Sequence, residues 1–239
     1  MLNFITLKWG DKYSADYVNK IYNMVSRNTT LPFRFYCLTD NPSGLSEHIT
    51  PLPHVDVGLK GFWNKLLLFR RDFHGLRGTA LYLDLDLVIV DNIDFLATHP
   101  GDFCICRNWS RRKMWNSSVM RFEFGAHPQI WEEFERNRES IMGRLNGDQE
   151  WIYECKPDAT EWPSDKIISY KKSLNSKALP WLEKVGLGKL GEIGARYMTV
   201  RPTPDASIVV FHGKPDPEDV MEKSYGYWKR APFVKAHWQ

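Results

Sequence analysis

A chain of 239 residues is long enough to form one substantial α/β domain with a buried core. Charged residues make up 26% of the sequence and hydrophobic residues 43%, which excludes a disordered or fibrous chain. A formal net charge of +3 is too small to indicate nucleic-acid binding, and no apolar run approaches the length of a membrane span.

The first forty residues predict a strand, a helix and a second strand. Residues 4–8 form a short apolar strand, and residues 13–27 place apolar side chains at helical spacing. Residues 33–39 are again apolar and stop at the turn-forming sequence Asp40-Asn41-Pro42. A strand, a helix and a strand in so short a segment predict a right-handed parallel crossover.

The rest of the chain continues this alternation and then loses it. The same patterns predict, in order, a helix at 63–73, a strand at 80–83 ending in Asp84-Leu85-Asp86, an apolar continuation at 87–90, strands at 103–106 and 117–122, and a helix at 128–144. Residues 155–200 predict loops and short helices, and residues 208–211 predict a last strand that ends at His212. We predict a single domain at 1–239 with a basic, aromatic tail at 217–239.

The cysteines and the first residues bear on the compartment. The four cysteines contain no Cys-x-x-Cys pair, so we expect free, buried thiols in a reducing compartment rather than a zinc site. The amino-terminal run carries neither a basic leader nor a small-residue cleavage site. These features predict a cytoplasmic protein.

The most informative segment is the strand that ends in Asp84 and Asp86. Side chains two apart on a strand point to the same face, and ligands bind at the carboxyl ends of strands in open α/β sheets. Two neighbouring carboxylates repel each other unless a cation lies between them, and Mg²⁺ and Mn²⁺ prefer oxygen ligands. The alternative interpretation is a solvated strand end beside a turn.

Three other residues have both a functional and a structural interpretation. His212 follows an apolar strand and is either a metal ligand or a structural side chain. Asp148, followed by Gln149, is either a functional carboxylate or the N-cap of a helix. Lys65, on the predicted helix at 63–73, is either a functional cation or a solvated helix residue.

The segment LYLDLDLVIVDNIDFL resembles the DxD region of GT-A glycosyltransferases, especially glycosyltransferase family eight and related bacterial glycosyltransferases. FYCLTD, NSSVMRF, NGDQEWI and VVFHGKPDP resemble further motifs of these enzymes in the same order, so that the likeness spans residues 3–216. Two positions depart from the pattern. Ser118 stands where glycine is usual, and the terminal motif is compressed, with Asp216 in place of tryptophan.

This resemblance implies an α/β GT-A fold and a metal-dependent transfer of sugar from a nucleotide-diphosphate sugar, with uridine diphosphate as carrier, to a glycan or glycolipid acceptor. It implies a Mn²⁺ or Mg²⁺ ion held by Asp84, Asp86 and His212. The donor would be bound by Thr6, Lys8, Tyr13, Asp40, Lys65, Asp84 and Lys214, and the catalytic or sugar-binding pair would be Asp148 and Gln149. It favours retention of configuration. In an inverting enzyme Asp148 would be the candidate base.

Other classes of protein fit parts of the sequence. Asp84 begins a DxDxV motif like that of haloacid-dehalogenase-like phosphatases, although those enzymes carry it near the amino terminus. A sugar-phosphate nucleotidyltransferase normally opens with a glycine-rich loop, whereas LKWGDKYS has one glycine. A non-catalytic sugar-nucleotide-binding protein would keep the same cleft without turnover.

The tail mixes aromatic rings with positive charges, a composition found in segments that bind the membrane interface. One interpretation is a weak peripheral contact with the inner face of a membrane. The other is that the rings pack back on the domain, since Pro232 interrupts any long amphipathic helix.

Overall fold

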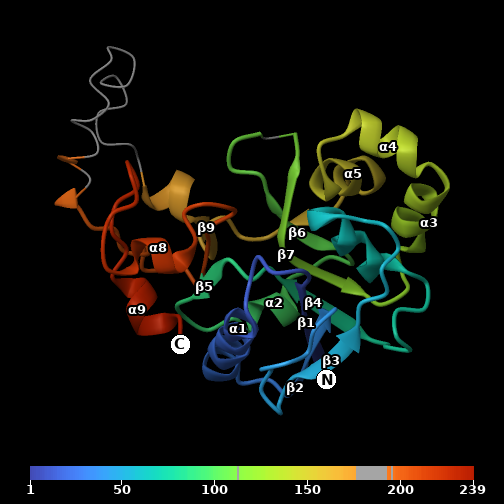
Figure 1. The fold of residues 1–239 in the computed structure, drawn as a ribbon, viewed down its shortest axis with the longest axis horizontal. Helices are drawn as coiled ribbons and strands as arrows, with labels where there is room; N and C mark the ends of the chain where they lie inside the picture. The colour runs from blue at the N-terminus through green and yellow to red at the C-terminus, as the bar shows by residue number, and fades with distance from the viewer. Residues whose placement is uncertain (112, 176–192, 195) are drawn as a thin grey trace. The chain divides into compact units, whose positions relative to one another are not determined.

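The computed structural model of the chain describes residues 1–111, 113–175, 193–194 and 196–239, and these form two compact units (Figure 1). The first unit contains Met1–Tyr22, Thr30–Leu85 and Asp94–Trp162. The second contains Asn23–Thr29, Asp86–Ile93 and Pro163–Gln239. The chain crosses from the first unit to the second within the DxD motif, because Asp84 and Leu85 belong to the first and Asp86 to the second.

A seven-stranded sheet forms the centre of the first unit. Neighbouring strands pair in parallel except where β7 pairs with β4 and β6, so that the sheet is mostly parallel, as predicted. The strands in spatial order are β3 (Thr50–Pro53), β2 (Phe33–Thr39), β1 (Leu2–Lys8), β4 (Thr79–Leu83), β7 (Trp115–Glu123), β6 (Cys104–Arg107) and β8 (Thr160–Glu161).

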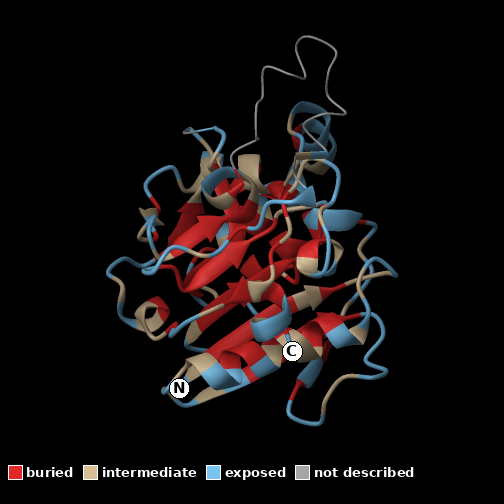
Figure 2. Ribbon diagram, turned by 90° about the vertical axis from the view of Figure 1, so that its left-hand side faces the viewer, coloured by how far each residue is buried: buried red, intermediate tan, exposed pale blue. Residues whose placement is uncertain are grey.

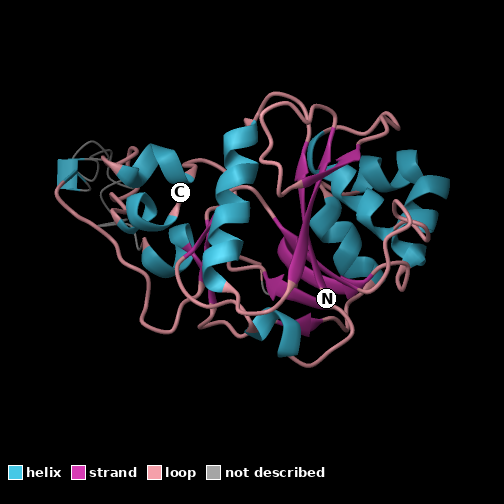
Figure 3. Ribbon diagram, turned by 90° about the horizontal axis from the view of Figure 1, so that it is seen from below, coloured by secondary structure: helices cyan, strands magenta, loops and turns pink. Residues whose placement is uncertain are grey.

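Helices cover this sheet, as the cyan and magenta elements of Figure 3 show. Three of them lie together in Figure 1, namely α3 (Pro128–Arg136), α4 (Arg138–Arg144) and α5 (Asp148–Cys155). The short helix α2 (Phe95–Thr98) and the 3₁₀ segment η1 (Gly61–Phe69) also belong to this unit, and η1 packs against both α3 and α5. Helix α1 (Ala15–Asn28) begins in the first unit and ends in the second.

The core explains why these segments fold as they do. The central strands are buried along most of their length, and they appear red in Figure 2. Aromatic rings fill the space between the sheet and its helices. Trp63 stacks on Phe134 with ring centroids 5.3 Å apart, and Phe69 lies 4.9 Å from Phe122. Apolar runs that cannot face water therefore specify the strands, and the rings fix the helices on them.

Two predicted helices differ from the observed elements. The predicted helix at 63–73 is a 3₁₀ segment over Gly61–Phe69, and it ends where Arg70 leaves the helical conformation, with φ −58° and ψ 140°. The predicted helix at 128–144 is two helices that meet at Asn137, where φ is −122°. The Asn137 side-chain amide donates to the carbonyl of Glu133, which is the local competition that makes asparagine a poor helix-interior residue.

A small mixed sheet forms the centre of the second unit. Strand β10 (Ile208–Val210) pairs antiparallel with β5 (Leu87–Ile89) and parallel with β9 (Ile167–Ser169). Residues 155–200, which were predicted to form loops and short helices, contain two strands and a π-helical segment. The strand β8 belongs to the sheet of the first unit, whereas β9 and η2 (Tyr170–Leu174) belong to the second unit. The rest of that prediction falls mainly on residues 176–192 and 195, which lie outside the described residues.

The tail is folded within the second unit. It contains the helices α8 (Pro217–Met221) and α9 (Phe233–His237), and the Trp238 side chain is only 3% exposed. The Arg27 guanidinium donates to the carbonyls of His237 and Gln239. These contacts favour packing of the tail on its own unit, and membrane contact stays a prediction. Among the described helices, none is long and apolar enough to cross a membrane.

Phe134 provides a test of the ring-based packing. Phe134→Ala removes a fully buried ring from the stack with Trp63, and we expect it to lower the free energy of unfolding by about 3–5 kcal/mol, measured by urea denaturation. Met142→Ala on α4 is the control, because Met142 is 37% exposed and its truncation should change stability by less than about 0.5 kcal/mol. Equal effects of the two substitutions would contradict this account of the core.

Candidate functional site

A buried lysine lies at the centre of the site in the first unit. The Lys65 ammonium lies 2.9 Å from Asp84 Oδ1, 2.9 Å from Ser117 Oγ and 3.8 Å from Asp148 Oδ2. The residue is only 5% exposed. The fold therefore brings together three of the predicted site residues, and Lys65 is a buried ion-paired residue rather than a solvated helix residue.

Ser117 was not predicted as a site residue, although it links Lys65 to Asp148. An ammonium group can only donate, so the Ser117 hydroxyl accepts from Lys65 and gives its single hydrogen to Asp148 Oδ2, 2.6 Å away. Burial raises the pKa of Asp148, and Lys65 and Ser117 oppose this shift by stabilising the carboxylate. A serine in the middle of a buried strand was the available sequence evidence for such a role.

Asp84 directly follows β4 and is held by contacts to β4 and β7. The Tyr82 hydroxyl donates to Asp84 Oδ1 over 2.6 Å, and the backbone N–H of Asp84 donates to the carbonyl of Ser118. Tyr82 and Asp84 are two residues apart, the spacing that places side chains on one face of a strand. Within this unit the cation beside Asp84 is the ammonium of Lys65.

Asp86 and His212 have their own surroundings in the second unit. Asp86 Oδ2 accepts a hydrogen bond of 2.9 Å from the backbone N–H of Gly213. The His212 ring lies 2.6 Å from Ser169 Oγ through Nε2, and its backbone is left-handed, with φ 42°. Burial, with a smaller contribution from Lys171, lowers the pKa of His212 to about 4. The imidazole is therefore neutral at pH 7, which is the form that binds metals.

The side chains of Asp86 and His212 are of the kinds that bind divalent cations. Carboxylate oxygens and a neutral imidazole are ligands that Mn²⁺ accepts, and both types are present in Asp86 and His212. In the part of the chain that the structure describes, however, no three histidine, cysteine, aspartate or glutamate side chains come together in an arrangement that could hold a metal ion. The chemistry fits a metal, and the assignment of Asp84, Asp86 and His212 as its ligands stays a prediction.

The residues expected to bind the base and ribose lie at the carboxyl ends of β1 and β2. These two strands pair in parallel register, with Lys8 opposite Thr39. Thr6 Oγ1 is buried without a hydrogen-bond partner among the described residues. Asp40 accepts from the backbone N–H of Gly10 over 3.0 Å. Tyr13 is half-buried, with its ring 4.7 Å from that of Tyr17.

The two remaining predicted residues have different surroundings. Lys214 is exposed and forms ion pairs of 3.0 and 2.8 Å with Asp216 and Asp219, which raise its pKa. Gln149 is half-buried and lies beside Asp148 in the first turn of α5. Their predicted roles are neither supported nor contradicted by these contacts.

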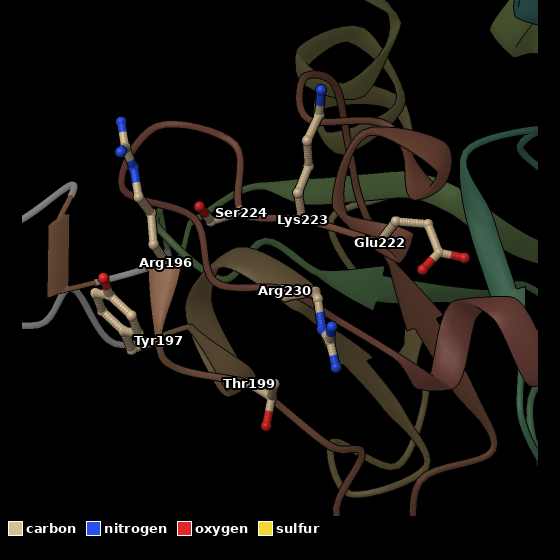
Figure 4. A pocket seen from close by; sticks show the side chains of 7 residues that line it. All are labelled: Arg196, Tyr197, Thr199, Glu222, Lys223, Ser224 and Arg230. Atoms are coloured by element: carbon tan, nitrogen blue, oxygen red, sulfur yellow. The ribbon is translucent and has the colours of Figure 1, made fainter.

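A surface pocket in the second unit contains none of the predicted site residues (Figure 4). It has a volume of about 460 Å³, and its charged lining combines three cations with Glu222. The carboxylate of Glu222 pairs with Lys235 at 2.7 Å. The lining residues are Arg196, Tyr197, Thr199, Glu222, Lys223, Ser224 and Arg230.

The fold is that of the GT-A glycosyltransferases. The galactosyltransferase LgtC, solved with donor and acceptor sugar analogues, matches with a TM-score of 0.61 over 90% of this chain and 88% of its own, at 12% identity. GlyE of Streptococcus pneumoniae TIGR4 matches at 0.59 and 13% identity, and the bifunctional WbbM at 0.56 and 10%. The match to GlyE spans 89% of this chain and 56% of GlyE. The match to WbbM spans 90% of this chain and 46% of WbbM.

These identities show a shared fold and nothing finer. No protein-family model matches the sequence, and no curated protein matches it. The predicted GT-A fold is therefore confirmed, and membership of family eight stays a prediction.

Lys65 provides a test of the buried cluster. Lys65→Met leaves Asp84 and Asp148 without their ammonium partner, and we expect a loss of about 3–5 kcal/mol in the free energy of unfolding at neutral pH. Urea denaturation of Lys65→Met and Lys65→Arg measures it. Lys20→Met, which removes a more exposed lysine paired with Asp16, should cost less than about 1 kcal/mol.

The loss in Lys65→Met should also depend on pH. Without Lys65 the folded-state pKa of Asp148 rises further, so the folded variant takes up a proton more readily than the unfolded chain does. The difference in the free energy of unfolding between the wild type and Lys65→Met should therefore become smaller as the pH falls. A deficit that stays constant with pH would contradict an electrostatic role for Lys65.

His212 provides a second pH test. The folded-state pKa of about 4 lies below the ordinary 6.5, so the unfolded chain binds a proton first as the pH falls. The contribution of the neutral ring to the free energy of unfolding is complete above pH 6.5 and is lost progressively between pH 6.5 and 4. His212→Asn, which tolerates a left-handed backbone, should lose less stability than the wild type across this window.

The measurement is urea denaturation at each pH with a chelator present. His48→Asn, at an exposed position in the first unit, serves as the control and should follow the wild type. Identical pH dependence in the wild type and His212→Asn would show that the ring is not held neutral by its surroundings.

Proposed function

We propose that the protein is a glycosyltransferase that moves a sugar from a nucleotide-diphosphate sugar, with uridine diphosphate as carrier, to a hydroxyl group of a glycan or glycolipid. The observation that carries this proposal is the buried cluster of Lys65, Asp84, Ser117 and Asp148 at the strand ends of a GT-A sheet. Ligands of open α/β sheets bind at this edge. Paired charges that are largely buried at this edge are typical of a site rather than of a packing core.

The neighbouring strand ends supply residues for the donor nucleotide. Thr6 and Lys8 lie in the carboxyl-terminal half of β1, and Tyr13 and Asp40 come after β1 and β2. The carboxyl ends of these strands lie at the same sheet edge because β1, β2 and β4 are parallel. We assign these four residues to the base and ribose. The buried, unpartnered hydroxyl of Thr6 supports this assignment, because such a group costs free energy unless a ligand satisfies it.

We assign Asp84, Asp86 and His212 to a Mn²⁺ or Mg²⁺ ion, and Lys214 to the diphosphate. When bound, such an ion would neutralise the charge that develops on the leaving diphosphate. The neutral imidazole of His212 and the carboxylate of Asp86 are the support for this assignment. Lys214 is at present balanced by Asp216 and Asp219, so its ammonium would exchange these partners for phosphate oxygens.

We assign Asp148 and Gln149 to the sugar and acceptor side. The acceptor hydroxyl attacks the anomeric carbon, the bond to the diphosphate breaks, and the transition state has oxocarbenium character. Lys65 and Ser117 hold Asp148 as an oriented carboxylate, which can stabilise positive charge on the sugar ring. We favour retention because the sequence resembles glycosyltransferase family eight, and in an inverting mechanism Asp148 would be the base.

Donor hydrolysis tests this proposal. The wild-type protein should release uridine diphosphate from a sugar nucleotide with Mn²⁺ present, and Asp86→Asn or a chelator should lower the rate by about 100-fold or more. Asp205→Asn, which changes an exposed carboxylate of the same unit, should leave the rate unchanged. Full turnover by Asp86→Asn with chelator present would remove the metal from the mechanism.

Two other results would replace the proposal. A non-catalytic binding protein would bind the nucleotide and turn over no donor. A phosphatase would hydrolyse p-nitrophenyl phosphate and lose that activity in Asp84→Asn.

A further inference from the structure

Phe62 is an exposed aromatic ring on a segment that is otherwise buried. Its side chain is 52% exposed, whereas all residues from Trp63 to Phe69 of the same 3₁₀ segment are buried. A phenyl ring that faces water while its neighbours fill the core adds little to folding. A single exposed apolar side chain is common on protein surfaces, so the case for a function depends on where this ring lies.

The Phe62 ring lies on the backbone of Gly147. A Cβ atom built on Gly147 would meet three ring carbons of Phe62 at 2.9, 3.2 and 3.5 Å. The backbone of Gly147 is fully extended, with φ 178° and ψ 179°, a conformation that any residue can adopt. Glycine is therefore not needed for the backbone conformation here. It leaves the space that the ring occupies.

The support beneath the ring is held in place. Glu150 accepts from the backbone N–H of Asn146 over 2.6 Å, and its carboxylate pairs with Arg111 at 3.2 Å. The carbonyl of Gly147 accepts from the N–H of Trp151. The residue after Gly147 is Asp148, which begins α5. The ring therefore rests on an ordered turn, one residue away from the proposed catalytic pair.

A second connection joins Phe62 to the same cluster. In a 3₁₀ helix the side chains of residues i and i+3 are eclipsed, so Phe62 and Lys65 extend from the same side of η1. Lys65 reaches inward to Asp84 and Ser117, while Phe62 remains at the surface. Phe62 is therefore three residues from Lys65 on η1, and its ring packs on Gly147, the residue before Asp148.

We propose that Phe62 is the stacking platform for the acceptor sugar, an inference that rests on the proposed glycosyl transfer. A pyranose ring presents C–H groups on one face and hydroxyls at its edge, so a flat apolar ring beside carboxylates and amides matches both parts. Asp148 and Gln149, the residues assigned to the acceptor side, follow Gly147 directly. Gly147 then has the role of a positioning residue, because its missing side chain leaves room for the Phe62 ring on the turn.

Two substitutions perturb the platform independently. Phe62→Ala removes the ring, and Gly147→Ala displaces it without touching Phe62. Both should raise the KM for the acceptor by about 10-fold or more, as expected for the loss of a stacking contact of about 1.4 kcal/mol. Donor hydrolysis without acceptor should stay within about twofold of the wild type, and Phe62→Trp should restore transfer. The double variant should be no worse than Phe62→Ala, because both changes act on one contact.

The probes are the methyl glycosides of glucose, galactose and N-acetylglucosamine, with the best wild-type acceptor used throughout. Met142→Ala and Gly143→Ala are the matched controls, since Met142 is exposed and nothing lies within 4 Å of a Cβ built on Gly143. An unchanged acceptor KM in Phe62→Ala, or an equal loss of donor hydrolysis, would overturn the platform. Saturation-transfer NMR of the same glycosides gives a readout that needs no turnover.

The two readouts separate the two proposals. If the wild type hydrolyses no sugar nucleotide, the proposed function fails. The platform then stands or falls on whether Phe62→Ala abolishes the NMR signal of a bound glycoside. If the wild type is active and Phe62→Ala matches it in both assays, the platform alone is wrong.

Discussion

The burial of the Lys65 ammonium is the constraint on which the first unit depends. A lysine that is 5% exposed is tolerated only when carboxylates and other acceptors surround it. Asp84 and Asp148 supply the negative charge, and Ser117 completes the set. These partners lie on three separate elements, so the charge on Lys65 fixes β4, β7 and α5 relative to η1. A site with preorganised charges is therefore also part of what holds the unit together.

The two carboxylates of the DxD motif are in different environments. Asp84 is neutralised by an ammonium and bonded by a tyrosine hydroxyl within the first unit. Asp86 accepts from a backbone N–H within the second unit, in which His212 is held neutral by burial. The simple argument that two neighbouring carboxylates require a metal between them is thus incomplete, because Lys65 already balances one of them.

The buried strands and the loop position Gly147 restrict the amino-acid sequence in different ways. Identities of 10–13% with LgtC, GlyE and WbbM are enough for the same fold, because a buried strand needs only apolar side chains of suitable volume. Glycine at position 147 depends on a contact instead. A Cβ atom at this position would overlap the Phe62 ring, whereas the extended backbone of Gly147 would accept any residue.

The sequence alone predicted the strands β1, β2, β4, β5, β6, β7 and β10, the parallel crossover and the candidate carboxylates, because apolar runs, turn residues and a two-residue spacing are local properties. It did not predict the short strands β3, β8 and β9. Residues 33–39 were predicted as the strand that β2 forms. Only the tertiary structure decided that residues 61–69 form a 3₁₀ segment, since an all-buried run has no amphipathic period to distinguish helix types. Likewise Lys65, Ser117 and Asp148 meet across 31 and 52 residues of sequence. Such contacts depend on how the elements pack, and no local pattern specifies them.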